Sequence, residues 1–419
     1  MPFDAPMAGT DPGPDAVRTW TVDGVRPELV VTPATPQEVA DTLADSAAEG
    51  WTVAPLGGGT ALSLGNPPER LDLGLSTARL TGIIDYEPMD LVLSVAAGTR
   101  LGDAQAVLAE HGQTLPIDPP RAGDATVGGL IATALAGPKR LGSGTLRDLL
   151  IGISVAHPSG TVTKAGGMVV KNVTGYDLSR VYHGSLGTLG VIVSANFKVL
   201  PLPRADATIL APMPSLDAAL ASAGRVRASR LQPDALEVAW FAGGWLAAVR
   251  VQGRETTVRT LTDETQSLLG SGQTLLGADS ADWWRRYADA QAATCGDGDV
   301  LVRCAVRPRA VGRLAQEAVT IVEALGLGLD SLAASVGLGV VALRITVERA
   351  EGAPEALGAL QRRLLNAADH ATIVAAPAAW KRGLDIWGRP PATLDLMRTL
   401  KEQFDPARVL NPGRFAGGI

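Results

Sequence analysis

The sequence predicts an α+β protein with two domains, and three observations support this prediction. The chain has 419 residues, more than a single hydrophobic core usually serves. Hydrophobic residues make up 46% of it, which is enough to fill packed cores. The first half contains a strand, a helix and a second strand that ends in consecutive glycines, and the second half alternates helical and strand-like segments. We place the boundary between the halves at Pro-Leu-Pro, residues 201–203.

In the first half, the clearest element is a helix from Pro36 to about Glu49. Thr35 can cap it, Pro36 suits its first position, and Glu38 can reach back to the cap. A strand over 51–56 then runs into Gly57-Gly58-Gly59-Thr60. The other elements that we expect here are strands at 29–31, 71–73, 83–85, 91–96, 149–155, 162–164 and 191–200, and helices at 101–111, 130–136 and 177–183.

The second half predicts an antiparallel sheet with helices on one face. The expected strands are 235–241, 245–252, 300–306, 340–347 and 372–375, and the expected helices are 215–228, 256–269, 310–325 and 354–367.

Composition excludes several classes of function. The formal net charge is −6 and no basic run stands out, so we expect no nucleic-acid partner. Cys295 and Cys304 match no iron–sulfur or zinc spacing, and the four histidines are scattered, so we expect no metal. Residues 1–20 lack the pattern of a secretory signal and predict a flexible tail. No apolar run has the length of a membrane span.

Three glycine-rich clusters are the segments that carry chemistry. They are Gly57-Gly58-Gly59-Thr60, Thr126-Val127-Gly128-Gly129, and the segment from Gly184 to Gly190. Residues without Cβ let the backbone approach a phosphate, and the N–H groups of such a loop or of a helix start can bind an anion. Each cluster alone has a plainer explanation: a turn for the first, close helix packing for the second, and a tight connection for the third.

Together these clusters resemble a known family. Leu56 to Thr60, Asp118-Pro119-Pro120, Ala125 to Gly129, Arg147-Asp148 and Gly184 to Ile192 resemble the FAD-binding domain of the vanillyl-alcohol oxidase and p-cresol methylhydroxylase (PCMH) superfamily. The segment from Phe404 to Arg414 resembles the tail of FAD-linked oxidases. Within that superfamily, residues 135–140 and 170–180 resemble the FAD-binding subunits of bacterial glycolate oxidases (glycolate dehydrogenases).

The resemblance implies a fold and a domain order. We expect a PCMH-type FAD-binding domain of two subdomains over 21–203, a substrate-like cap domain over 204–390, and a C-terminal segment over 391–419 that returns to the first domain.

It also implies which residues bind FAD. The glycine loop would hold the pyrophosphate, and the other two clusters would flank the cofactor. The expected cofactor-binding residues are Gly57, Gly58, Gly59, Thr60, Ala61, Pro119, Thr126, Val127, Gly128, Gly129, Thr133, Arg147, Asp148, Lys171, Gly187, Gly190, Val191 and Asn411. Family members with covalent FAD often carry His where this chain has Thr60, so we expect non-covalent FAD.

Lys171 has a more specific chemical role among these residues, and the nearby Asp177 has a structural one. Lys171 could stabilise the negative charge of a reduced flavin, although a solvated surface lysine is the alternative. Asp177 could cap the helix that follows it.

The substrate site is less clear than the cofactor site. Related hydroxyacid dehydrogenases have a His-rich segment in the second domain, and this chain has only His370 there, to which we assign no role. No catalytic residue is assigned. Arg303, Arg344 and Lys381 are candidates for binding a substrate carboxylate.

The resemblance implies an FAD-dependent oxidoreductase that acts on CH–OH groups. The expected protein is a cytoplasmic subunit of a hetero-oligomeric glycolate oxidase, with a partner flavoprotein subunit that carries the hydroxyacid site and an iron–sulfur subunit. Peripheral contact with the inner membrane through the complex is a second option for its location. An autonomous 2-hydroxyacid dehydrogenase and a non-catalytic flavin-binding interaction subunit are the alternatives.

Overall fold

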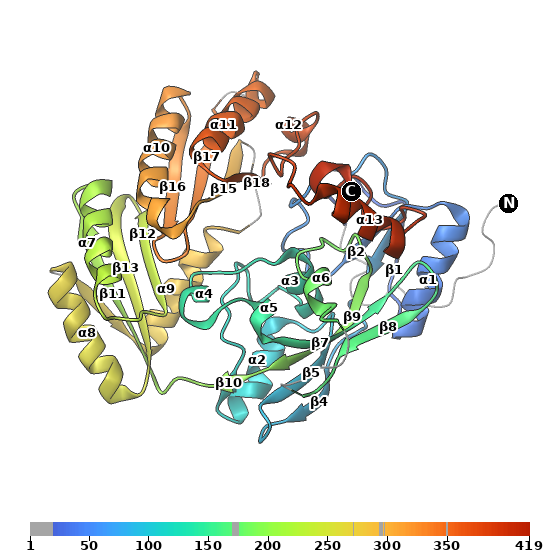
Figure 1. Cartoon of the computed structure of the whole chain (residues 1–419), viewed down its shortest axis with the longest axis horizontal. Coiled ribbons are helices and arrows are strands. Elements are labelled where there is room, and N and C mark those ends of the chain that lie inside the picture. Colours follow the sequence, from blue (N-terminus) through green and yellow to red (C-terminus); the bar gives the residue numbers. More distant parts are fainter. Residues whose placement is uncertain (1–19, 170–175, 271, 293–295, 297, 349–350) are drawn as a thin grey trace.

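The computed structural model describes residues 20–169, 176–270, 272–292, 296, 298–348 and 351–419. Two bodies lie side by side in it, one built around a five-stranded and a three-stranded sheet and the other around an eight-stranded sheet (Figure 1). The first uses residues up to about 201 together with the C-terminal segment, and the second uses the chain between them. The α+β fold class predicted from the sequence is confirmed.

The first subdomain is a small parallel sheet. Its strands β1 (Leu29–Val31), β3 (Leu73–Ser76) and β2 (Val53–Leu56) lie in the order β1-β3-β2. Helix α1 (Pro36–Glu49) connects β1 to β2 and buries Val39 and Leu43 completely. Strand β2 carries the chain from the sheet core into the glycine loop.

Helix α1 forms where the sequence predicts it, because both of its ends are specified locally. The Thr35 hydroxyl accepts a hydrogen bond from the Glu38 N–H at 3.1 Å, and Pro36 lies in the first turn. The Glu38 carboxylate bonds to the N–H of Ala34, one residue before the cap. At the other end Gly50 adopts φ 68°, which ends the helix.

The second subdomain is an antiparallel five-stranded sheet in the order β4-β5-β9-β7-β8. Its strands are β4 (Ile83–Glu87), β5 (Val92–Ala96), β7 (Leu150–Ala156), β8 (Val162–Gly166) and β9 (Val191–Lys198). Its helices are α2 (Leu101–Glu110), α3 (Val127–Thr133), α4 (Arg140–Ser143), α5 (Leu146–Leu149) and α6 (Ser179–Tyr182), and β6 (Gln113–Thr114) pairs with β10 (Leu200–Pro201). Apolar side chains from β5, β7, β9, α2 and α3 form one core.

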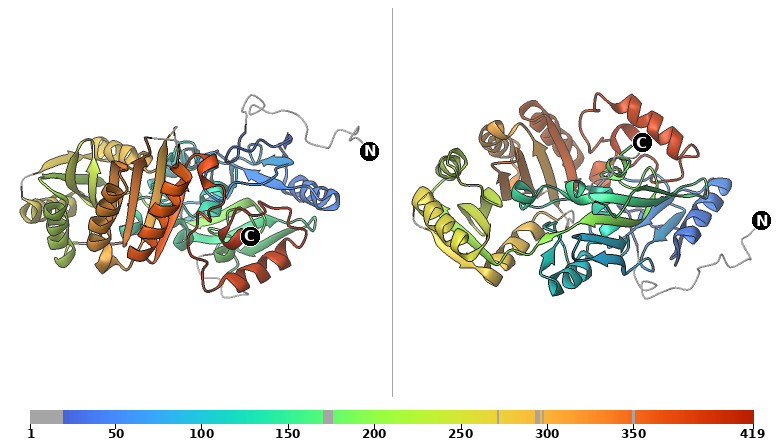
Figure 2. Two further views of the ribbon diagram at one scale, coloured as in Figure 1. Left: turned by 90° about the horizontal axis from the view of Figure 1, so that it is seen from above. Right: turned by 60° about the horizontal axis from the view of Figure 1, so that its bottom comes forward.

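The cap is an eight-stranded antiparallel sheet in the order β14-β11-β13-β12-β16-β17-β15-β18. The strands are β11 (Ala205–Met213), β12 (Ala235–Phe241), β13 (Gly244–Gly253), β14 (Gln273–Leu276), β15 (Asp299–Ala305), β16 (Gly328–Ser335), β17 (Val340–Thr346) and β18 (His370–Ala375). One face packs against α7 (Leu216–Ala228), α8 (Glu255–Leu269), α10 (Val311–Ala324) and α11 (Ala353–Ala367). Figures 1 and 2 show these helices along one side of the sheet.

The other face of the cap sheet carries an element that the sequence did not predict. Helix α9 (Gly277–Asp289) packs Trp283, Trp284 and Tyr287 against small residues such as Ala333 and Ala342. Strands β11, β14 and β16 were also not predicted, so the sheet is wider than expected. The helices on its first face and its antiparallel pairing agree with the prediction.

The C-terminal segment lies against the first body (Figure 2). After α12 (Ala378–Lys381) and α13 (Leu394–Phe404) the chain runs beside β2, where the Val53 N–H donates to the Val409 carbonyl at 2.8 Å. Val409 and Leu410 are buried in the core of the parallel sheet. Two short 3₁₀ turns complete the elements, at Pro308–Ala310 and Ala416–Gly418. Among the described residues, no helix has the length and apolar character to cross a membrane.

Candidate cofactor site

A cavity opens where β2 ends, between the glycine loop, α3 and the turn before β9. About 760 Å³ in and around it, open solvent included, is free of protein atoms. Thirteen of the residues predicted to bind the cofactor line it: Gly57, Gly58, Gly59, Thr60, Ala61, Thr126, Gly128, Gly129, Thr133, Gly187, Gly190, Val191 and Asn411. The structure therefore brings together segments that lie more than 350 positions apart in the sequence.

The glycine loop presents unused backbone donors. The N–H groups of Gly57, Gly59, Thr60 and Ala61 make no hydrogen bond within the described part of the chain, whereas the N–H of Gly58 donates to the Thr126 hydroxyl at 3.3 Å. Successive free N–H groups around a cavity form a concave anion-binding surface. The loop thus fits the two phosphates of a dinucleotide cofactor.

Close approach of backbone explains why this loop needs glycine. A Cβ on Gly58 would lie 1.9 Å from the Asp124 carbonyl oxygen, and one on Gly57 would lie 2.4 Å from the Thr126 hydroxyl oxygen. Gly59 adopts φ 72°, in the left-handed region. The glycines hold the loop against the start of α3, and they do so whether or not a ligand is bound.

The second cluster does not supply free N–H groups, and this part of the prediction was wrong. The N–H of Val127 donates to the Thr99 carbonyl, that of Gly128 to the Ala97 carbonyl, and that of Gly129 to the Thr126 hydroxyl. A Cβ on Gly128 would lie 2.8 Å from Ala97 Cβ. The alternative explanation, close packing through small residues, therefore holds for this segment.

The third cluster forms a tight connection that also borders the cavity. The N–H groups of Gly184 and Leu186 donate to carbonyls at the end of α3, both at 2.8 Å. A Cβ on Gly190 would lie 2.3 Å from Val155 Cγ1, so its lack of a side chain serves packing of the sheet. Gly187 adopts φ 69° and lies beside Pro55 and Asn411.

The C-terminal segment completes the cavity wall with Asn411. Its side-chain N–H₂ donates to the Leu186 carbonyl at 2.7 Å, while its Oδ1 atom is buried and has no partner in the described part of the chain. A buried acceptor without a partner is unfavourable unless a ligand donates to it. FAD carries N–H and O–H groups that can do so. The site therefore fits this cofactor at two independent points, the free N–H groups of the glycine loop and the Asn411 Oδ1 atom.

Five predicted residues lie elsewhere. Pro119 is buried in a turn outside the cavity lining, and Val127 points into the core of the second subdomain. Arg147 and Asp148 are exposed, and Asp148 caps α5 through Thr145. Lys171 lies outside the described residues. The cofactor roles of these five remain predictions.

Other sequence-based assignments are resolved by the contacts. Asp177 does not cap α6 through the backbone and instead binds the side chains of Ser179 and Arg180. Lys381 is buried against Asp23 and two carbonyl groups, and Arg344 donates to the carbonyls of Ala290 and Ala292. Neither is available to a substrate carboxylate.

The sequence also missed several residues of the cavity wall. They are Pro55, Leu56, Leu62, Thr77, Ala132, Leu186, Ile192 and Arg414. The Arg414 guanidinium donates to the carbonyls of Leu62 and Leu64 at 2.8 and 2.6 Å, and burial lowers its pKa to about 10. Its place in the run Asn411-Pro412-Gly413-Arg414, which resembles the tail of FAD-linked oxidases, was the one available signal.

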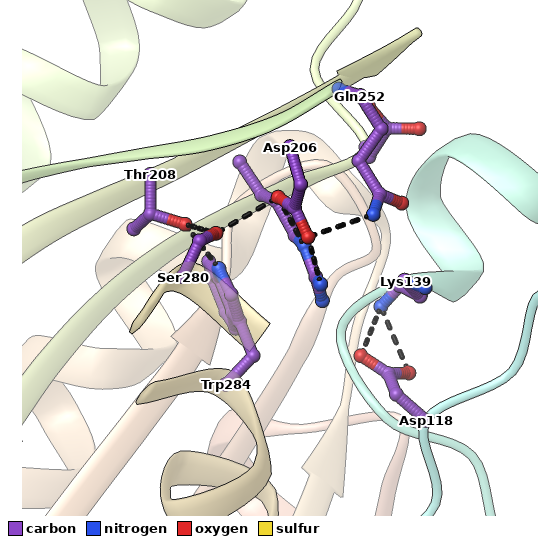
Figure 3. A network of polar contacts seen from close by, with 9 residues as sticks. Asp118, Lys139, Asp206, Thr208, Gln252, Ser280 and Trp284 are labelled. Atoms are coloured by element: carbon purple, nitrogen blue, oxygen red, sulfur yellow. Dashed lines mark hydrogen bonds and ion pairs between the residues drawn. The ribbon is translucent and has the colours of Figure 1, made fainter. Parts of the chain in front are cut away.

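Figure 3 shows two groups of polar contacts, one in the cap and one in the first body. Within the cap, the Asp206 carboxylate accepts hydrogen bonds from Arg250, Gln252 and Ser280 at 2.5 to 3.1 Å. In the first body, the Asp118 carboxylate accepts the Lys139 N–H at 3.1 Å.

Direct hydrogen bonds also cross between the bodies. The Arg121 N–H donates to the Asp289 side chain at 2.7 Å, and the Gly142 N–H to the Asp234 carbonyl at 3.2 Å. The cap is therefore tied to the cofactor domain through both α9 and α4.

Two buried carboxyl groups at this interface titrate near neutral pH. Burial raises the pKa of Glu237 to about 7, against the hydrogen bond from the Tyr287 hydroxyl and the charge of Arg140, while the Asp118 charge raises it further. Burial likewise raises the pKa of Asp118 to about 6, opposed by Lys139. Both acids hold protons in the folded chain at pH values where the unfolded chain has released them.

We expect this difference to make the free energy of unfolding depend on pH. The folded-state pKa values of Asp118 and Glu237 are raised. The stabilising contribution of these two protonated carboxyl groups to the free energy of unfolding is therefore fully present below about pH 4 and is lost as pH rises through 6 to 7. Glu237→Gln cannot ionise, so its stability relative to the parent chain should improve by on the order of 2 kcal/mol between pH 5 and 8. Urea unfolding of both proteins across this range is the measurement, and a stability difference that does not change with pH would contradict the prediction.

The fold and the cavity define a dinucleotide-binding protein of the flavin type, and comparisons with known proteins agree. The family model described as "FAD binding domain" matches residues 27–178, and the family model described as "FAD linked oxidases, C-terminal domain" matches residues 388–415. The chain therefore carries an FAD-binding domain and, near its C-terminus, a segment of an FAD-linked oxidase C-terminal domain, and its cofactor is FAD.

Curated relatives are similar over parts of the chain. Glycolate oxidase subunit GlcE of Escherichia coli K12 is 46% identical over 129 residues, which cover 30% of this chain and 37% of that protein. Glycolate oxidase subunit GlcD of Bacillus subtilis 168 is 31% identical over 50% of this chain and 45% of its own length, and D-lactate dehydrogenase of Archaeoglobus fulgidus is 34% identical over 50% and 46%. The chain spans less than half the length of each of these relatives.

Solved structures support the fold across both domains. A structure of alkyldihydroxyacetonephosphate synthase superposes with a TM-score of 0.69 over 93% of this chain and 76% of that one, at 17% identity. A second crystal form of the same enzyme gives 0.67 over 92% and 77%. The arrangement of the first body and the cap is therefore shared with these solved structures.

We expect FAD to be released intact when the protein is denatured. No His, Cys or Tyr is present among the described residues that line the cavity. Thr60 occupies the loop position at which relatives with covalent FAD often carry His. No side chain there is therefore suited to a covalent flavin bond. Precipitation of the purified protein with acid should leave all the flavin in the supernatant, where its absorbance is measured. Yellow colour that stays with the precipitate would contradict this expectation.

Proposed function

We propose that this chain is the FAD-binding subunit of a glycolate oxidase complex, in which it takes part in oxidising glycolate to glyoxylate. The observation that carries the proposal is the 46% identity to a subunit of that name. FAD supplies a ring that accepts two electrons from a substrate C–H bond. A partner flavoprotein subunit and an iron–sulfur subunit complete the proposed complex, which we place in the cytoplasm or at the inner membrane surface.

The chain's own residues support a cofactor-binding role more clearly than a complete catalytic role. The free N–H groups of the glycine loop and Asn411 would hold FAD, and the cap covers one side of the domain. His370 is exposed on the edge strand β18, so the second half offers no histidine base inside the structure. A partner that supplies the base is consistent with this arrangement.

Reconstitution tests the proposal. The purified chain, loaded with FAD, is mixed anaerobically with glycolate and its absorbance spectrum is followed, and the same is done after adding the two partner subunits. We expect the flavin to stay oxidised alone and glycolate oxidation to require this chain in the complete mixture. Full activity of the partners without this chain would refute the proposal.

A second candidate is an autonomous FAD-linked 2-hydroxyacid dehydrogenase. Similarity to a D-lactate dehydrogenase over 50% of the chain favours it. In that case D-lactate or glycolate would bleach the flavin of the isolated chain at enzyme-like rates, and the subunit proposal would be replaced.

A further inference from the structure

Helix α9 ends on a carboxylate that the cap holds in place. Asp289 is the last residue of this helix. Three aromatic side chains pack the helix against the cap sheet, and the Arg344 guanidinium donates to the carbonyls of Ala290 and Ala292, just beyond the helix end, at 3.1 and 2.9 Å. A negative charge at the C-terminal end of a helix is unfavourable in itself, because it meets the negative end of the helix dipole. The carboxylate therefore gains from a donor outside the helix.

That donor is a backbone group of the first body. The N–H of Arg121 donates to Asp289 Oδ1 at 2.7 Å. Arg121 adopts φ 53°, in the left-handed region, which is uncommon for a residue with a side chain. Its carbonyl accepts the N–H groups of Asp124 and Ala125, both at 3.0 Å, so residues 121–125 form a tight turn. The cap thus holds, through one hydrogen bond, a turn that begins in an unfavourable backbone conformation.

The same turn lies directly behind the glycine loop. The Asp124 carbonyl oxygen is so near Gly58 that a Cβ on this glycine would lie 1.9 Å from it. The next residue but one, Thr126, caps α3, and its hydroxyl accepts the Gly58 N–H at 3.3 Å. Any shift of the turn must therefore move Gly58 or separate it from α3. The free N–H groups that follow Gly58 in the loop would move with it.

We propose that Asp289 is a positioning residue for FAD, although it is not among the described residues that line the cofactor cavity. Its carboxylate holds the turn at 121–125 through the Arg121 N–H, and this turn holds the phosphate-binding glycine loop in place. Because coupling between two binding events is reciprocal, bound FAD would also strengthen the junction between the cap and the first body. The inference concerns the cofactor and does not depend on the substrate.

Release of FAD from the loaded chain tests this role. The FAD-loaded proteins are diluted in steps, and the recovery of flavin fluorescence gives the dissociation constant. Asp289→Ala removes the acceptor, and we expect it to weaken FAD binding by about tenfold, because a hydrogen bond to a charged group contributes at least this factor. Asp289→Asn keeps an oxygen that can accept the Arg121 N–H, and its dissociation constant should stay within about threefold of that of the parent.

Asp282→Ala is the matched control. Asp282 is an exposed residue of the same helix and pairs with Arg285, as Asp289 does, but its ion pairs in the described part of the chain stay within α9. This variant loses the same charge and should bind FAD like the parent. Equal FAD affinity in Asp289→Ala and the parent, an equal loss in Asp282→Ala, or a loss in Asp289→Asn as large as that in Asp289→Ala would overturn the proposal.

A second pair of variants tests the turn itself and does not require Asp289→Ala to fold. Arg121→Gly and Arg121→Val both lose the guanidinium that pairs with Asp124, and both keep the backbone N–H. Glycine adopts a positive φ readily, whereas a β-branched residue rarely does. We expect Arg121→Gly to bind FAD nearly as tightly as the parent and Arg121→Val to bind it several-fold more weakly. Equal FAD affinity in these two variants would also overturn the proposal, whether or not the complex oxidises glycolate.

Discussion

Gly58→Ala should reduce FAD affinity by about 100-fold or more. The new methyl group would lie 1.9 Å from the Asp124 carbonyl oxygen and 3.3 Å from the Thr126 nitrogen, and both are backbone atoms that cannot rotate away. The loop must therefore move away from α3. Its free N–H groups at Gly59 and Thr60 would move with it, and charge-assisted hydrogen bonds to a phosphate depend strongly on position.

Titration of the FAD-free protein with FAD, followed by the quenching of flavin fluorescence, measures this loss. The matched control is Gly102→Ala, in the exposed first turn of α2, where an added Cβ meets nothing within 4 Å. The control should bind FAD normally, with stability unchanged or slightly higher. Unchanged FAD affinity in Gly58→Ala would mean that the loop does not hold the cofactor in the way inferred here.

Lys381→Met should lower the free energy of unfolding by about 3 to 5 kcal/mol. The Lys381 ammonium is fully buried and binds Asp23 and the carbonyls of Ser63 and Gly65, the latter two at 2.7 and 3.3 Å. Its removal leaves the Asp23 carboxyl in a place where burial already raises its pKa. It also leaves carbonyl oxygens without their donor.

Urea unfolding of a double-mutant cycle separates the charge effect from lost packing. Asp23→Asn combined with Lys381→Met should cost less than the sum of the two single changes, because no unpaired charge then remains. Arg382→Met, on the exposed neighbouring residue, is the control and should change stability by less than about 0.5 kcal/mol. Additive single effects, or a loss below about 1 kcal/mol in Lys381→Met, would show that the pair contributes little.

Local signals in the sequence predicted much of the fold. Helix α1 was predicted because Thr35, Pro36 and Gly50 specify its ends without help from distant residues. The glycine loop was recognised because three consecutive glycines are visible in any sequence. Such features depend on neighbours within a few positions, and they require no knowledge of the tertiary structure.

The missed elements depend on contacts between distant positions. Helix α9 has few apolar residues, and three of its large buried side chains, Trp283, Trp284 and Tyr287, stand in a run crowded with Asp and Arg. Strand β11 contains Pro212 and follows a proline-rich boundary, which argued against a strand. The order of eight cap strands is set by long-range pairing, which has no local signal.

The residues of the candidate site likewise fall into those that local motifs predicted and those that only the three-dimensional structure showed. Gly57 to Thr60 and Asn411 were found from motifs, whereas the use of the α3 N–H groups by Thr99 and Ala97 could be seen only in three dimensions. The same is true of Arg414, whose partners at 62 and 64 are separated from it by about 350 positions.

The route of the C-terminal segment has a consequence for biosynthesis. Val409 and Leu410 add to the core beside β2, Asn411 forms part of the cavity wall, and Lys401 is buried against Asp405 and the carbonyls of Thr188 and Leu410. On a ribosome the glycine loop is synthesised early, but the wall that closes over it emerges about 350 residues later. We therefore expect the flavin to bind after translation. A chain that ends before residue 411 would contain the glycine loop but lack the part of the cavity wall that helps to retain the cofactor.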